Sequence, residues 1–109
     1  MIGRGRASEL LLTGRNVSAS EALEIGLVDR VVRVSELPSE VRSTADLIKA
    51  NAPLALRYCL EAVTGGLDSS LANGLEREAE LFGACCATTD MREGTRAFLE
   101  KRAANFRGQ

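Results

Sequence analysis

The chain has 109 residues, of which 45% are hydrophobic and 27% charged, and its formal net charge is −1. This composition is typical of a folded globular protein and argues against disorder, and the lack of a basic surplus argues against a nucleic-acid partner. The sequence has no histidine and only three cysteines, which excludes Ser-His-Asp and Cys-His nucleophiles and both histidine-bearing and four-cysteine zinc sites.

The first 26 residues carry the signals of two short helices. A Leu-rich segment over residues 7–13 is followed by Gly14, which predicts a helix end. Ser18 and Glu21 have the spacing of a capping box, in which the serine hydroxyl accepts from an early helix amide and the carboxylate reaches back. Gly26 is typical of the position just after a helix. We therefore predict a second helix from Ser18 to Gly26.

Residues 27–34 are the only good strand candidate. They read LVDRVVRV, in which apolar and charged residues partly alternate. A strand needs a ladder partner for its N–H and C=O groups, and the sequence offers no second convincing strand. We therefore expect one short orphan strand whose partner lies in missing sequence or in another subunit.

From Leu37 onward the pattern is helical. Apolar residues recur along one face at Leu37, Val41, Ala45 and Ile48. Pro53 opens the next helix, which we expect to end at Gly65-Gly66.

Two further helices follow. Ser69 or Ser70 is a candidate cap for the first, in which Gly74 and Gly83 either weaken the helix or mark close packing. The spacing of Asp90 and Glu93 resembles a capping box for the last helix. After it, the segment ANFRG leaves the helix, and we expect Phe106 to dock. Helices with broad apolar faces favour tight association with something else.

The cysteines and the hydropathy pattern bear on location. Cys59, Cys85 and Cys86 are odd in number and lack a zinc spacing, so we expect reduced, structural thiols. No apolar run approaches the ~20 residues that span a bilayer. The sequence therefore predicts a cytoplasmic protein without a membrane partner.

Several segments together resemble the enoyl-CoA hydratase/isomerase family, the crotonase superfamily. The N-terminal ones are Leu12-Thr13-Gly14-Arg15, Ala19 to Ala22, Gly26-Leu27-Val28 and Val31-Val32. The downstream ones, NAPLAL, GLEREAELF and DMREGTRAFLEKRAANFRG, are similar to the family's C-terminal helices, and the last most resembles enoyl-CoA hydratase proper. The resemblance covers nearly the whole chain, with its motifs in the family's order.

The resemblance implies a mainly α chain: the C-terminal helical region of a crotonase-like fold, a ββα superhelix, with the orphan strand near residues 27–34. Residues 1–34 would end the crotonase core, and residues 35–109 would form a helical region for oligomerisation and substrate capping. Family members are much longer, and their N-terminal part supplies the oxyanion hole and two catalytic glutamates. We therefore expect a C-terminal fragment with no catalytic residue of its own, inactive alone.

The activity implied for the intact enzyme is hydration of trans-2-enoyl-CoA in fatty-acid β-oxidation. The resemblance implies no organic cofactor and no metal, because CoA enters as part of the substrate. The implied partners are an acyl-CoA thioester and further copies of the chain, in a trimer or a dimer of trimers. Two alternatives stay open: a non-enzymatic oligomerisation module, and a fragment of another crotonase-family enzyme such as an enoyl-CoA isomerase.

By resemblance, Phe82, Phe98 and Lys101 match positions near the bound acyl-CoA. Phenylalanine offers an apolar wall, and lysine offers a point-charge donor to phosphate. The alternative is that Phe82 and Phe98 are core residues of amphipathic helices and Lys101 is a solvated helix residue. Positive charge is concentrated near the end of the chain, where it either attracts CoA phosphates or forms a solvated face, at Arg92, Arg96, Lys101, Arg102 and Arg107.

Overall fold

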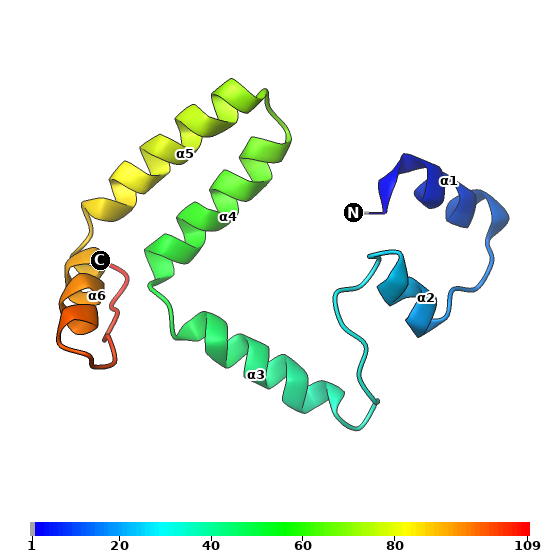
Figure 1. Cartoon of the computed structure of the whole chain (residues 1–109), viewed down its shortest axis with the longest axis horizontal. Helices are drawn as coiled ribbons and strands as arrows, with labels where there is room; N and C mark the ends of the chain where they lie inside the picture. The colour runs from blue at the N-terminus through cyan, green and yellow to red at the C-terminus, as the bar shows by residue number, and fades with distance from the viewer. Residues whose placement is uncertain (1) are drawn as a thin grey trace. The chain divides into compact units, whose positions relative to one another are not determined.

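The computed structural model describes residues 2–109, which form six α-helices (Figure 1). They are α1 (Gly3–Thr13), α2 (Ala19–Glu24), α3 (Leu37–Lys49), α4 (Pro53–Leu67), α5 (Leu71–Cys86) and α6 (Thr89–Leu99). The chain divides into two compact units: the N-terminal unit ends at Val41 and the C-terminal unit begins at Arg42, within α3. None of the helices over these residues is long and apolar enough to cross a membrane.

The mainly α class is confirmed, but the short strand expected near residues 27–34 is not formed. Within residues 2–109 no segment is a β-strand, and residues 30–33 are neither helix nor turn. The reason is physical: an extended segment becomes a strand only when another strand completes its ladder, and no described segment does so. The predicted functional division after residue 34 stays a prediction.

Local signals shape both helices of the N-terminal unit. Ser18 is the predicted N-cap of α2, and its hydroxyl accepts a hydrogen bond of 3.1 Å from the amide of Glu21. Gly26, with φ of 73°, follows the end of α2 as predicted. There the Leu27 amide donates to the Ala22 carbonyl at 2.8 Å, which closes a Schellman motif. Helix α1 ends as predicted at Gly14, although it begins earlier than expected, at Gly3.

Glu21 differs in one respect from a complete capping box. Its carboxylate accepts two hydrogen bonds from the guanidinium of Arg15, at 2.6 and 3.0 Å. This contact is the main reason why the pKa of Glu21 lies below its ordinary value. The carboxylate therefore ties the preceding loop to α2.

Helices α4 and α5 form an antiparallel hairpin in the C-terminal unit (Figure 1). The predicted end of α4 at Gly65-Gly66 is one residue early, because the helix continues to Leu67. Gly66 also belongs to a close helix approach: a Cβ at Gly74 of α5 would lie 3.4 Å from the Cα of Gly66. Close packing thus explains Gly74, whereas a Cβ at Gly83 would meet nothing within 4 Å.

The caps of α5 and α6 follow the same local chemistry, with one correction. Ser70 caps α5 as predicted and accepts from the amide of Asn73 at 3.3 Å. Helix α6 is capped by Thr88, whose hydroxyl accepts from the Met91 amide at 3.0 Å. The capping box expected from Asp90 and Glu93 is therefore wrong: Thr88 already occupies the cap, and both carboxylates are free for other partners.

Few side chains are buried within the described residues. The buried apolar ones are Ala22, Leu81 and Ala97. Large apolar side chains are instead exposed on every helix, including Leu11, Leu23, Val41, Leu60, Phe82 and Phe98. The helices therefore carry apolar faces that the chain itself does not cover.

Candidate functional site

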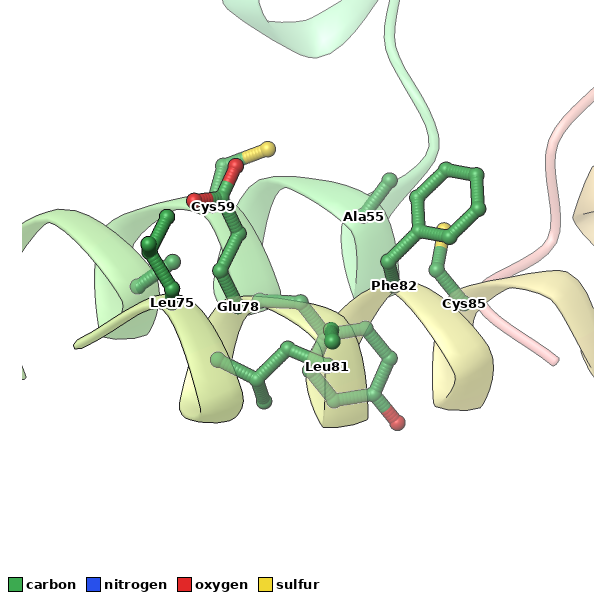
Figure 2. A pocket seen from close by; sticks show the side chains of 10 residues that line it. Ala55, Cys59, Leu75, Glu78, Leu81, Phe82 and Cys85 are labelled. Atoms are coloured by element: carbon green, nitrogen blue, oxygen red, sulfur yellow. The ribbon is translucent and has the colours of Figure 1, made fainter. Parts of the chain in front are cut away.

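An apolar groove runs between α4 and α5 (Figure 2). It encloses about 480 Å³. Helix α4 contributes Ala55, Tyr58, Cys59 and Ala62, and helix α5 contributes Leu75, Glu78, Ala79, Leu81, Phe82 and Cys85. Figure 2 shows Phe82 and Cys85 at one end of the groove and Leu75 at the other. Such a surface suits an acyl chain or an apolar protein segment rather than a charged group.

Phe82, the first of the predicted site residues, is a wall of this groove. It follows the buried Leu81 in α5, and the two adjacent side chains differ sharply: 6% of Leu81 is exposed, against 68% of Phe82. Leu81 therefore contributes to packing within the chain, whereas Phe82 is available to whatever fills the groove.

Phe98 and Lys101, the other two predicted residues, lie together at the end of α6 and do not line the groove. The helix ends at Leu99, so Lys101 lies beyond it rather than on its face. The Lys101 amide donates to the Phe98 carbonyl at 3.2 Å, and the Phe98 side chain is 83% exposed. The three predicted residues thus lie on two separate surfaces, one in the α4–α5 hairpin and one at the end of α6.

Asp90 anchors the segment that follows α6. It is 3% exposed, and its carboxylate accepts from the amides of Arg107 at 2.8 Å and Gly108 at 2.7 Å. The Asp90 amide and the Thr89 hydroxyl both donate to the main-chain oxygen of Gln109. The predicted docking of Phe106 is confirmed, since a Cβ at Gly94 of α6 would lie 3.3 Å from its ring.

Glu93 is a second anchor, one turn further along α6. Its carboxylate accepts two hydrogen bonds from the Arg102 guanidinium, at 2.6 and 3.0 Å, and one from the Asn105 amide at 2.9 Å. The pKa of Glu93 is lowered to about 2. The hydrogen bonds from Arg102 are the largest cause, and the one from the Asn105 amide is the second. Arg102 also donates to Glu100 at 2.6 Å, and the two carboxylates raise its pKa. We refer to residues 103–109, held by Asp90 and Glu93, as the C-terminal strap.

The sequence did not reveal the strap contacts. Asp90 and Glu93 have the capping-box spacing, and only the earlier Thr88 signals that the cap is already occupied. Their partners lie 9 to 18 residues away along the chain, which no local pattern reports.

Acidic and cysteine side chains in the described part of the chain form no metal-ligand cluster. Among residues 2–109 there is no cluster of three His, Cys, Asp or Glu residues that could hold a metal ion. The three cysteines are free, as predicted. Arg77 of α5 forms ion pairs with Glu61 of α4 and with Glu80 of α5. These two acids therefore have a structural role.

Comparison with known proteins identifies the family. A family model for enoyl-CoA hydratase/isomerase matches residues 1–109. The chain is 42% identical to the crotonyl-CoA hydratase of Syntrophomonas wolfei, covering 97% of this chain and 41% of that protein. It is 39% identical to the short-chain-enoyl-CoA hydratase of Clostridium acetobutylicum, covering 94% and 39%.

Solved structures that resemble this chain belong to the same family. The enoyl-CoA hydratase from Bacillus anthracis is 42% identical to this chain and superimposes with a TM-score of 0.96, covering 99% of this chain and 42% of that one. The chain thus spans about two fifths of the length of the relatives it matches. The chain belongs to the enoyl-CoA hydratase/isomerase family.

Proposed function

We propose that this chain supplies the C-terminal helical part of an enoyl-CoA hydratase, which adds water to trans-2-enoyl-CoA in fatty-acid β-oxidation. The family match over residues 1–109 and the hydratase names of the relatives support this activity. In this proposal the chain alone is inactive. The family resemblance assigns the oxyanion-hole amides and the two glutamates to the N-terminal part, whereas this chain covers 42% of the Bacillus anthracis hydratase.

The observation that carries the proposal is the uncovered apolar surface of the helices. Only three apolar side chains within residues 2–109 are buried, while large ones are exposed on all six helices. Apolar area of this extent favours burial against another protein surface. A catalytic core is the partner that the family fold offers.

In the assembled enzyme, the reaction needs charge stabilisation and proton transfer. As water adds to the double bond, the thioester carbonyl becomes an enolate-like oxyanion, which two backbone N–H donors of the core stabilise. One glutamate activates the water and the other delivers a proton. CoA is part of the substrate, and the proposal includes neither an organic cofactor nor a metal.

We assign three residues of this chain to the bound acyl-CoA. Phe82 borders the acyl pocket from the α4/α5 groove. Phe98 and Lys101 contact the CoA portion from the end of α6, where both are exposed. None of them takes part in bond-making, so their loss should raise KM more than it lowers kcat.

The same apolar faces support a second candidate, a non-enzymatic module that joins homologous subunits into a trimer or a dimer of trimers. The two candidates make different demands on the partner. A module needs only association, whereas the hydratase proposal requires that association restores turnover. The cytoplasmic location stays a prediction with either candidate.

The test is reconstitution. The 109-residue chain, the complementary N-terminal part of the Bacillus anthracis hydratase, and their mixture are each assayed for loss of crotonyl-CoA absorbance. We expect turnover in the mixture only. Turnover of a 3-enoyl-CoA without hydration would favour the isomerase alternative, and a stable but inactive complex would favour the oligomerisation module. Activity of the chain alone, with host hydratase excluded, would contradict the proposal.

A further inference from the structure

Lys101 occupies a backbone conformation that lysine rarely adopts. Its φ is 53°, and it is the only residue other than glycine with positive φ among residues 2–109. It stands at the position after the α6 C-cap, where the Lys101 amide donates to Phe98 and the Arg102 amide donates to Ala97 at 3.0 Å. This is a Schellman motif, and glycine is the usual residue there because a Cβ is disfavoured in the left-handed region.

The equivalent turn after α2 has glycine at the position that Lys101 occupies after α6. That turn has the same pair of hydrogen bonds, from Gly26 to Leu23 and from Leu27 to Ala22, and a glycine with φ of 73°. The lysine at the end of α6 therefore adopts its conformation at a cost that glycine would not incur. Backbone strain of this kind clusters at functional sites, so Lys101 is a candidate for a functional role.

The next residue holds the turn in place. Arg102 contacts both carboxylate oxygens of Glu93, which lies in the middle of α6, and also contacts Glu100. A two-pronged contact between guanidinium and carboxylate fixes geometry better than a lysine contact would. The main chain on either side of Lys101 is thus attached to α6, by the turn hydrogen bonds and by Arg102.

The two adjacent cations, Lys101 and Arg102, differ in their ion pairs. Arg102 is neutralised by Glu93 and Glu100, whereas Lys101 is exposed and forms no ion pair within the described residues. A basic residue at a helix C-terminus also complements the helix dipole, which is the purely structural explanation of Lys101. That explanation does not account for the strain, because a lysine within the last turn would serve the dipole equally well.

We propose that Arg102 is a positioning residue: its contact with Glu93 holds the left-handed turn that presents the Lys101 ammonium group to a phosphate of the CoA ligand. This inference rests on the proposed function, from which it takes the ligand. It adds that Phe98, Lys101 and Arg102 form one preorganised unit, so that the turn need not be ordered when the ligand binds.

The test uses the full 109-residue chain, labelled for NMR and titrated with CoA at low and high salt. We expect the amide signals of residues 98–102 to shift. Lys101→Gly should weaken binding about 5- to 30-fold, the value of one charge-assisted contact, and added salt should reduce that difference. The same substitution should raise the melting temperature, by roughly 4 °C, because it relieves the strain. A role in stability alone cannot produce these opposite effects.

Arg102→Ala tests the positioning role directly. We expect CoA binding to weaken about 2- to 10-fold although Lys101 is intact, with Arg102→Lys in between. Glu93→Gln breaks the same contact from its other side and should match Arg102→Ala. The control is Arg42→Ala, which removes an exposed arginine of α3 that lies outside the basic group near the end of the chain and for which no ion pair is seen in the described residues.

Three outcomes would overturn the inference. If Arg102→Ala and Glu93→Gln bind CoA as tightly as Arg42→Ala does, the positioning role is removed and the proposed function is left intact. Lys101→Gly binding as wild type would remove the phosphate contact. Absence of any shift at residues 98–102 with saturating CoA would remove both, while the hydratase proposal would still be decided by the crotonyl-CoA assay.

Discussion

The carboxylate of Asp90 accepts a hydrogen bond of 2.7 Å from the amide of Gly108, 18 residues further along the chain. Together with the Arg107 amide, this contact gives a nearly buried charge two main-chain donors. Hydrogen bonds to a charged group are worth about 1.5–3 kcal/mol each, and a buried partner left unsatisfied costs a similar amount. Asp90 is thus the principal attachment of the C-terminal strap to α6.

Asp90→Ala should therefore release the strap. We expect the Arg107 and Gly108 amides to lose their protection from hydrogen exchange, while α4 and α5 keep theirs. Local opening should become easier by about 2–3 kcal/mol. Asp29→Ala, which removes an exposed acid in the N-terminal unit, is the control. Unchanged exchange at Arg107 and Gly108 in Asp90→Ala would show that other contacts hold the strap.

The Glu93 contact should make part of the strap's stability depend on pH. The pKa of Glu93 is about 2 in the folded chain, against an ordinary value of 4.5, so the folded state binds its proton more weakly than the unfolded state. The contribution is therefore complete above about pH 4.5 and is lost as the pH falls towards 2. NMR signals of Asn105 should follow this loss in wild type. In Glu93→Gln the contribution is absent at all pH values, and a similar titration of Asn105 there would assign the effect to another acid.

Substitutions at two adjacent residues of α5, Leu81 and Phe82, should distinguish packing within the chain from binding to a partner. Leu81→Ala should destabilise the isolated chain by about 2–5 kcal/mol, because its buried side chain leaves a cavity. Phe82→Ala should change that stability by less than about 0.5 kcal/mol, yet weaken association with the complementary core roughly tenfold or more. Urea unfolding and sedimentation measure the two quantities. Equal effects of both substitutions on the isolated chain would contradict the distinction.

Two helix glycines should respond differently to alanine. Gly83→Ala should stabilise the isolated chain by about 0.5–1 kcal/mol, because its Cβ meets nothing within 4 Å. Gly94→Ala should gain less, since its Cβ would lie 3.3 Å from the Phe106 ring, which must then move. Denaturant midpoints give the comparison, and the ring signals of Phe106 report its displacement. Equal gains with unchanged Phe106 signals would mean that the contact is loose.

The uncovered apolar faces predict that the isolated chain associates with itself or is only marginally stable. Exposed side chains such as Leu12, Val34 and Phe98 favour burial against any available partner. Sedimentation at increasing concentration should show oligomers, and addition of the complementary core should replace them with a defined complex. A cooperative monomer at high concentration would argue against this prediction.

The sequence by itself determined the local structure and the family. Ser18, Ser70 and Gly26 act within a few residues of their own position, so their patterns predicted the caps and the helix end. The order of the motifs likewise identified the family, because resemblance needs no coordinates. Phe82, Phe98 and Lys101 were selected by that resemblance, and their contacts with CoA stay predictions.

Only the tertiary structure decided which residues are connected across longer distances. Asp90 and Glu93 read as a capping box, but they hold the strap through partners up to 18 residues away. Gly65-Gly66 read as a helix end, and α4 ends one residue later, but only the structure shows that Gly66 meets Gly74 of α5. Residues 27–34 read as a strand, but strand pairing requires a neighbour that residues 2–109 do not supply. In each case the deciding partner is remote in sequence, and local patterns carry no information about it.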